Sequence, residues 1–224
     1  ADFSVCSEDF LELLCALGVR EGLSGQGVIA FLALTCAIVE RLDTAEAVFV
    51  FGVCGFRRRL VEWIGSAGVE GMAEGAIAVL RGLADRSAEI RSALTQDSAV
   101  ICRILSFLDC EARPALQTEA WSMLETFARS SSPHFLHFCH TEAVLPTMLA
   151  LADAQNAQKK LQFLRITTTL LATEEHSEHH AVAEQLERAA ALERISAWQF
   201  DPCPRLFAAA AGLLRRFFSE SLEE

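Results

Sequence analysis

The sequence predicts an all-α fold in which units of three helices repeat along the chain. Apolar residues recur at helical spacing through most of the sequence, as in ALQTEAWSMLETFA at 115–128. No alternation of apolar and polar residues continues long enough to indicate a strand. Apolar positions also return at a fixed offset of 44 residues, as Leu60, Ile104, Met148 and Leu192 do.

Each of the four predicted units contains a short helix, a second helix and a long third helix. The first helices are predicted at 45–53, 89–96, 134–140 and 177–186, the second at 56–65, 99–109, 143–153 and 187–198, and the third at 72–85, 116–129, 159–173 and 204–217. Gly65, Pro114 and Pro202 interrupt the periodicity between helices. A unit of this length cannot bury its apolar faces alone, so neighbouring units are expected to stack as a solenoid with one continuous core.

Small residues on three of the long helices support this stacking. Ala76, Ala120 and Ala208 fall at corresponding places and would allow neighbouring helices to approach closely. Residues 1–43 are expected to form a degenerate first unit, with helices near 8–18 and 28–41, which caps the N-terminal end. Residues 44–218 hold the four repeats and 219–224 form a polar tail, so the chain is predicted to be a single structural domain.

Charge and apolar content indicate the kind of partner. The formal net charge is −11 and the 19 Lys and Arg residues are dispersed, which argues against a nucleic-acid groove and favours a protein partner. The stretch at 22–39 lacks charges, but its apolar part covers only 28–39 and is shorter than the roughly 20 residues that span a bilayer. We therefore expect a buried helix there, no membrane partner, and a chain that is a monomer or a subunit of a complex.

The cysteines and the missing motifs point away from secretion and from catalysis. Several of the eight cysteines lie in apolar runs, such as Cys36 in LALTCAIV, where Cys behaves as a small hydrophobic residue. With no CxxC pair and no secretory leader, a cytoplasmic location is expected. GLSGQG at 22–27 has the spacing of neither a dinucleotide loop nor a P-loop, and GxSxG and HExxH motifs are lacking. We predict a protein that is not an enzyme and needs no cofactor.

The histidines give a weaker alternative of another class, a metal-binding protein. All six lie in two clusters, one over 134–140 and one over 176–180, comprising His134, His137, His140, His176, His179 and His180. Helical i, i+3 spacing would bring His137 and His140 to one metal ion, with His180 of the next unit as a third ligand. The structural alternative is that these histidines simply occupy the polar edge of helix starts.

The repeat length and the third-helix sequence resemble a known superfamily. A period in the low forties with three helices is similar to armadillo repeats, and LQTEAWSMLETFA at 116–128 resembles their third-helix signature, particularly that of importin-alpha. The resemblance implies a right-handed superhelical solenoid that binds proteins on its concave face. Peptide-binding members carry a Trp and, four residues later, an Asn on that face. The corresponding pairs here are Ala78 and Gly82, Ser122 and Thr126, and Ile166 and Leu170, so capture of an extended basic signal peptide is not expected.

A narrower resemblance links the chain to the armadillo-type nucleotide-exchange factors of DnaK-type chaperones. The segments at 34–64 and 143–178 are similar to an opening and a later repeat of that family. Lys160 matches a basic position of its motif, whereas a second basic position is occupied by Gln162. The resemblance implies that the concave face clasps the nucleotide-binding domain of the chaperone and releases ADP.

Together these comparisons select a set of candidate partner-binding residues. The set comprises Ala78, Gly82, Glu119, Ser122, Thr126, Lys160, Gln162, Ile166 and Leu170. An adaptor or scaffold subunit that binds a helix or peptide is the alternative to the exchange factor. The apolar character of Ala78, Ile166 and Leu170 mildly favours that alternative.

Overall fold

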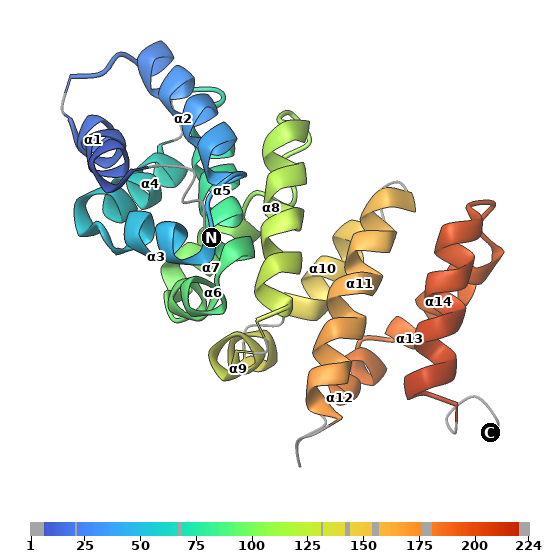
Figure 1. The fold of residues 1–224 in the computed structure, drawn as a ribbon. Coiled ribbons are helices and arrows are strands. Elements are labelled where there is room, and N and C mark those ends of the chain that lie inside the picture. The colour runs from blue at the N-terminus through green and yellow to red at the C-terminus, as the bar shows by residue number, and fades with distance from the viewer. Residues whose placement is uncertain are drawn as a thin grey trace. The chain divides into compact units, whose positions relative to one another are not determined.

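The chain is all-helical wherever its structure is described. The computed structural model describes residues 7–20, 22–66, 69–130, 132–141, 144–153, 157–175 and 181–219. Within these residues every regular element is an α-helix, except one 3-10 helix, which confirms the all-α part of the predicted fold class. Contacts between residues divide the chain into two compact units, Ala1–Thr126 and Phe127–Glu224, each described below by itself (Figure 1).

Eight helices account for the first unit. They are α1 (Glu8–Val19), α2 (Gly25–Val39), α3 (Thr44–Gly52), α4 (Cys54–Gly65), α5 (Met72–Arg86), α6 (Ala88–Thr95), α7 (Ser98–Leu105) and α8 (Pro114–Ala128), of which α8 ends two residues beyond the division. All eight predicted helices are present. Only the helix predicted at 99–109 is clearly too long. After α7 the Phe107 and Leu108 N–H groups donate to carbonyls three residues earlier, which ends the α-helical pattern. The Ser106 hydroxyl also donates to the Arg103 carbonyl.

Short-range side-chain caps explain where several of these helices begin. Ser7, Ser24, Ser87 and Asp97 each accept a hydrogen bond from a backbone N–H three residues later. Asp43 and Glu46 form a reciprocal capping box at the start of α3, with N–H···O distances of 2.8 and 2.9 Å. Because these caps depend on neighbouring residues only, they are available before any tertiary contact forms.

Helix α5 is the central element of the first unit. Eight of its residues are buried, and it packs against α2 and α4. The contact with α2 depends on two glycines one heptad apart. A Cβ at Gly75 would lie 3.0 Å from Leu32, and one at Gly82 would lie 2.7 Å from a methyl of Val39. The predicted buried helix over 28–41 is thus confirmed as α2, which lies side by side with α5 (Figure 1).

The second unit is built around a long helix, α11. Its elements are α9 (Pro133–Thr141), α10 (Val144–Asp153), α11 (Ala157–Glu174), α12 (Ala181–Arg188), α13 (Ala191–Ala197), the 3-10 helix Trp198–Phe200 and α14 (Pro204–Phe217). Helix α11 packs against α10, α12 and α14. The predicted helices at 177–186 and 187–198 are both present, but the break between them falls later, at Ala190, whose φ of 52° is left-handed. Residues 177–180 lie outside the described residues.

The repeat is regular at first and then lengthens. Helices α4, α7 and α13 begin at residues 54, 98 and 191, so the first interval is 44 residues and the next two together are 93, where a fixed offset would give 88. The fixed offset of 44 is therefore wrong for the last unit. Ala191 and Ile195 are buried there and Leu192 is only half-buried, while Ala210, rather than the predicted Ala208, is the buried alanine of α14. Ala76 and Ala120 are fully buried, as predicted.

No single helix among the described residues is both long and apolar enough to cross a membrane. Pro133–His140 and Val144–Asp153 pass a test of length and composition only when combined, and they are bent by 74° relative to each other.

Candidate partner-binding groove

Helices α5 and α8 border a shallow groove in the first unit. Its volume is about 550 Å³, and it is lined by Glu74, Gly75, Ala78, Pro114, Ala115, Thr118 and Glu119. Glycine and two alanines supply much of the lining, so the helix backbones are covered by few side-chain atoms. A groove of this kind leaves space for side chains from another molecule.

Local hydrogen bonds fix the wall that α8 contributes. The buried amide of Gln117 donates to the Leu108 carbonyl over 2.7 Å and anchors the first turn of α8 to the segment after α7. The hydroxyls of Thr118 and Ser122 donate to carbonyls four residues earlier, over 2.8 and 2.9 Å. Both hydroxyl hydrogens are thereby used within the helix, and the hydroxyl oxygens remain as acceptors.

A bidentate ion pair borders the groove. Both Nε and Nη2 of Arg113 contact Oε1 of Glu74, at 3.1 and 2.9 Å, and Nη2 also lies 2.8 Å from Oε2. Both side chains are mostly buried. This geometry is the stronger form of the arginine–carboxylate pair, and it joins the residue before α8 to the first turn of α5.

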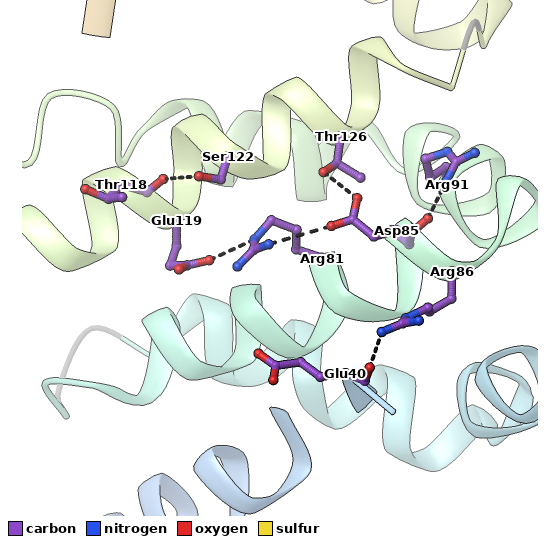
Figure 2. A network of polar contacts seen from close by, with 10 residues as sticks. Glu40, Arg81, Asp85, Arg86, Arg91, Thr118, Glu119, Ser122 and Thr126 are labelled. Atoms are coloured by element: carbon purple, nitrogen blue, oxygen red, sulfur yellow. Dashed lines mark hydrogen bonds and ion pairs between the residues drawn. The ribbon is translucent and has the colours of Figure 1, made fainter. Parts of the chain in front are cut away.

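A second set of polar contacts bridges α5 and α8 (Figure 2). Arg81 Nε lies 3.0 Å from Glu119 Oε2, and Arg81 Nη1 lies 3.6 Å from Asp85 Oδ2. The buried Thr126 hydroxyl donates to Asp85 Oδ1 over 3.0 Å. The chain Glu119–Arg81–Asp85–Thr126 thus crosses twice between the two helices, and Figure 2 shows it following the face that they share.

Two further arginines hold the end of α5. The Arg86 guanidinium donates to the Glu40 carbonyl just after α2, and Arg91 donates to the Ala84 carbonyl over 2.7 Å (Figure 2). These bonds satisfy carbonyls near helix C-termini, where cations are favoured. The groove face is therefore held in a defined arrangement by α2, α5 and α8.

Cys36, which contacts the groove residue Gly75, is a protonated thiol at neutral pH. Cys36 Sγ lies 3.9 Å from the Gly75 carbonyl oxygen, and burial, together with the charge of Glu119, raises the pKa of this thiol to about 11. Burial raises the pKa of Cys15 to about 11, and burial with nearby Glu174 raises that of Cys139 to about 12. Thiols with such pKa values behave as small hydrophobic groups, in line with the sequence interpretation.

The structure brings together only part of the predicted partner-binding set. Ala78 and Glu119 line the groove, and Ser122 lies one turn farther along α8. The other two candidates of this unit have structural roles: Gly82 allows the close approach of α2, and Thr126 is fully buried in the α5–α8 contact.

The candidates of the second unit are corrected by their burial. Ile166 and Leu170 are 0% and 1% exposed and Gln162 is also buried, so none of these three side chains is presented to a partner. The predicted face assumed an offset of 44 residues, and an error of one residue in this offset turns the assigned face by about 100°. Arg165, directly before Ile166 and 43 residues after the half-buried Ser122, is exposed instead.

Lys160 is accessible only in part. Its Nζ lies 3.7 Å from Asp201 Oδ2 and 5.7 Å from the centre of the Trp198 ring. Trp198 in turn donates from Nε1 to Asp153 Oδ1 over 2.9 Å. The lysine is therefore part of a local cluster that attaches the 3-10 helix to α10 and α11.

The histidine clusters are only partly within the described residues. His176, His179 and His180 lie outside them, and the described residues contain no group of three or more His, Cys, Asp or Glu side chains that could hold a metal ion. His134 and His137 are exposed on α9. His140 Nε2 instead lies 3.0 Å from Oε1 of the buried Glu174, whose two oxygens both accept the Val182 N–H at 3.0 Å.

Apart from Glu119, the charged residues that border the groove were not predicted from the sequence. Arg81 and Asp85 have i, i+4 spacing, which is a readable signal of a helix-surface pair. The partners of Glu74 and Arg81 are 39 and 38 residues away, and no local pattern indicates those contacts.

Comparisons with known proteins support the fold and nothing finer. No protein-family model matches the chain, and no curated protein matches it. The chain is similar to a crystal structure of an engineered protein, with a TM-score of 0.65 and 11% sequence identity, over 94% of this chain and 97% of that one. The shared property is an all-helical fold.

Proposed function

We propose that this protein is a protein-binding module that receives a helix or peptide of its partner in the groove between α5 and α8. The observation that carries the proposal is the groove itself, which combines a lining of small residues with ion pairs at its border. Short side chains provide space for apolar groups of the ligand. The paired carboxylates and guanidinium groups offer polar partners for its backbone.

The proposed architecture behind this function is an armadillo-type, right-handed superhelical solenoid. The order of short, second and long helices supports it, as does the burial of Ala76 and Ala120 at matching places on two long helices. Stacked helical repeats of this class present extended surfaces to other proteins. The armadillo resemblance of the sequence and the groove thus support the same class of function.

The charges of the groove indicate what kind of ligand it receives. Glu74, Asp85 and Glu119 provide three carboxylates, whereas Arg81 and Arg113 provide two guanidinium groups. With a net charge of −11 for the whole chain, a neutral or basic ligand is favoured over an acidic one. An adaptor or scaffold role fits this description best.

A pair of matched substitutions tests the groove. Ala78→Arg places a long charged side chain in the groove, and Ala99→Arg makes the same change at an exposed alanine on α7 outside it. Proteins captured from a native extract by the unmodified chain are identified, and their binding to each variant is measured by calorimetry. We expect loss of binding with Ala78→Arg and unchanged binding with Ala99→Arg; equal binding by both variants contradicts the proposal.

The exchange-factor function is a second prediction with its own assay. If it holds, adding the purified chain to a DnaK-type chaperone loaded with fluorescent ADP accelerates ADP release. Lys160, which matches the motif of that family, is ion-paired, and Gln162, which departs from it, is buried, so no observation of the structure favours this function over the scaffold. If ADP release is not accelerated, the exchange-factor function is excluded and the scaffold function remains.

A further inference from the structure

Helix α1 presents an apolar strip to solvent. Phe10, Leu13 and Leu17 are 42%, 58% and 42% exposed, and their spacing of three and four residues places them on one side of the helix. The opposite side packs Leu11, Leu14 and Cys15 into the core. Helix α1 is thus apolar on two sides, and the first unit covers only one of them.

Acidic side chains border this strip. Glu8, Asp9 and Glu12 are all exposed, and none of them forms an ion pair with another described residue. At 100° per residue, Asp9 and Glu12 lie along one edge of the strip. A partner for this side of α1 therefore needs an apolar surface next to a positive charge.

Helix α14, the last helix of the described residues, offers such a surface. Phe207 is 50% exposed, and the neighbouring Ala208 and Gly212 are also exposed. Arg205 and Arg215 are exposed at the same helix and form no ion pair within the described part of the chain, whereas Arg216 is already paired with Glu175. This side of α14 is apolar and basic where that of α1 is apolar and acidic.

We propose that α1 of one copy of this chain docks on α14 of a second copy. Phe10, Leu13 and Leu17 would pack against Phe207 and the small residues beside it, with the acidic edge of α1 facing Arg205 and Arg215. The complementary charge is the reason for choosing a second copy as the occupant, because both halves of the contact are present on the same chain. The groove between α5 and α8 takes no part in this contact.

A contact between two different surfaces has a distinctive consequence. After one such contact forms between two copies, one α1 and one α14 remain; these either pair with each other in a closed dimer or bind further copies. Sedimentation velocity over a wide concentration range should show a mass that rises from 24.5 kDa to that of a dimer or beyond. A chain that stays monomeric at every concentration overturns the proposal.

Two single variants show whether both surfaces are used. Leu13→Glu and Phe207→Glu each place a charge in the contact at an exposed position, and each variant alone should lose self-association. An equimolar mixture should form a dimer and nothing larger, because each variant keeps one intact surface. If Phe207→Glu alone still forms a dimer, or if the mixture stays monomeric, the proposed pairing is wrong.

Matched controls distinguish this contact from nonspecific hydrophobic association and from misfolding. Leu34 on α2 is 56% exposed, and Leu34→Glu should leave self-association unchanged; loss of association in this control contradicts the proposal. Glu12→Arg and Arg215→Glu should each weaken association by roughly tenfold or more, since each places like charges opposite each other. The double variant should regain association, and its failure to do so overturns the charge pairing. Unchanged circular dichroism of every variant shows that the fold is retained.

Discussion

Arg81 of α5 and Glu119 of α8 form an ion pair whose Nε–Oε2 distance is 3.0 Å and whose side chains are 31% and 25% exposed. A pair in this partly buried position should couple the two helices that border the groove. We expect a double-mutant cycle of Arg81→Ala and Glu119→Ala to give a coupling energy of about 1 kcal/mol, measured by urea unfolding. The exposed Arg188–Glu184 pair serves as a control and should give about 0.3–0.5 kcal/mol. Zero coupling between Arg81 and Glu119 would contradict a bridging role.

Two helical glycines should respond with opposite signs to the same substitution. Gly82→Ala introduces a methyl 2.7 Å from Val39, and overpacking of this kind costs about 1–3 kcal/mol, which exceeds the gain of about 1 kcal/mol in helix propensity. Gly212→Ala meets no atom within 4 Å, so only the gain remains. Urea unfolding should show Gly82→Ala to be less stable than the unmodified protein and Gly212→Ala to be more stable by roughly 0.5–1 kcal/mol. Stabilisation by both substitutions would show that α2 does not pack closely against α5.

Glu174 should be among the most sensitive polar residues of the second unit. Its buried carboxylate accepts the Val182 N–H and contacts His140, so Glu174→Ala leaves a buried N–H without its acceptor. We expect a loss of about 2–3 kcal/mol in the free energy of unfolding. Glu187→Ala, at an exposed position of α12, is the matched control and should change stability by less than about 0.5 kcal/mol. Equal effects of the two substitutions would rule out a structural role for the Glu174 contacts.

The buried thiols should make the free energy of unfolding fall at alkaline pH. Burial raises the pKa of Cys36 and Cys15 from 9.0 to about 11, and that of Cys139 from 9.0 to about 12, so the folded state favours the neutral thiol. This contribution is fully present below pH 9, where the thiols are protonated in both states. It is lost as the pH rises from about 9 towards 12, because the unfolded chain releases these protons first.

Denaturation midpoints measured between pH 7 and pH 12 check this expectation, and they should fall through the alkaline part of that range. Cys139→Ala should reduce the fall by removing one of the three thiols. A thiol reagent at neutral pH should modify the exposed Cys102 well before Cys139. Rapid modification of Cys139 in the folded protein would contradict its burial.

The helices could be predicted from the sequence because their signals are local. Caps such as Asp43 with Glu46, proline at the start of α8 and α14, and apolar periodicity all lie within a few residues of the helix they define. The candidate site could be predicted only where the repeat is regular. Ala78 and Ser122 are related by 44 residues and lie at or beside the groove, whereas Ile166 and Leu170, which follow Ser122 and Thr126 by 44 residues, lie in the core.

The charged border of the groove could not be predicted, because its contacts join distant positions. Arg113 reaches Glu74 and Arg81 reaches Glu119 only after α5 and α8 have packed together. Side-chain pairing across such distances depends on the rotation of each helix about its axis. An ungapped repeat pattern specifies that rotation only to within one residue, or about 100°.

Ala190 has a mechanical consequence for the second unit. Helix α12 ends at Arg188 and α13 begins at Ala191, so the chain changes direction through Ala189 and the left-handed Ala190 alone. A connection this short has no slack with which to absorb displacement. A force applied to α13 would therefore be transmitted directly to α12, and the two helices should move together as one rigid body.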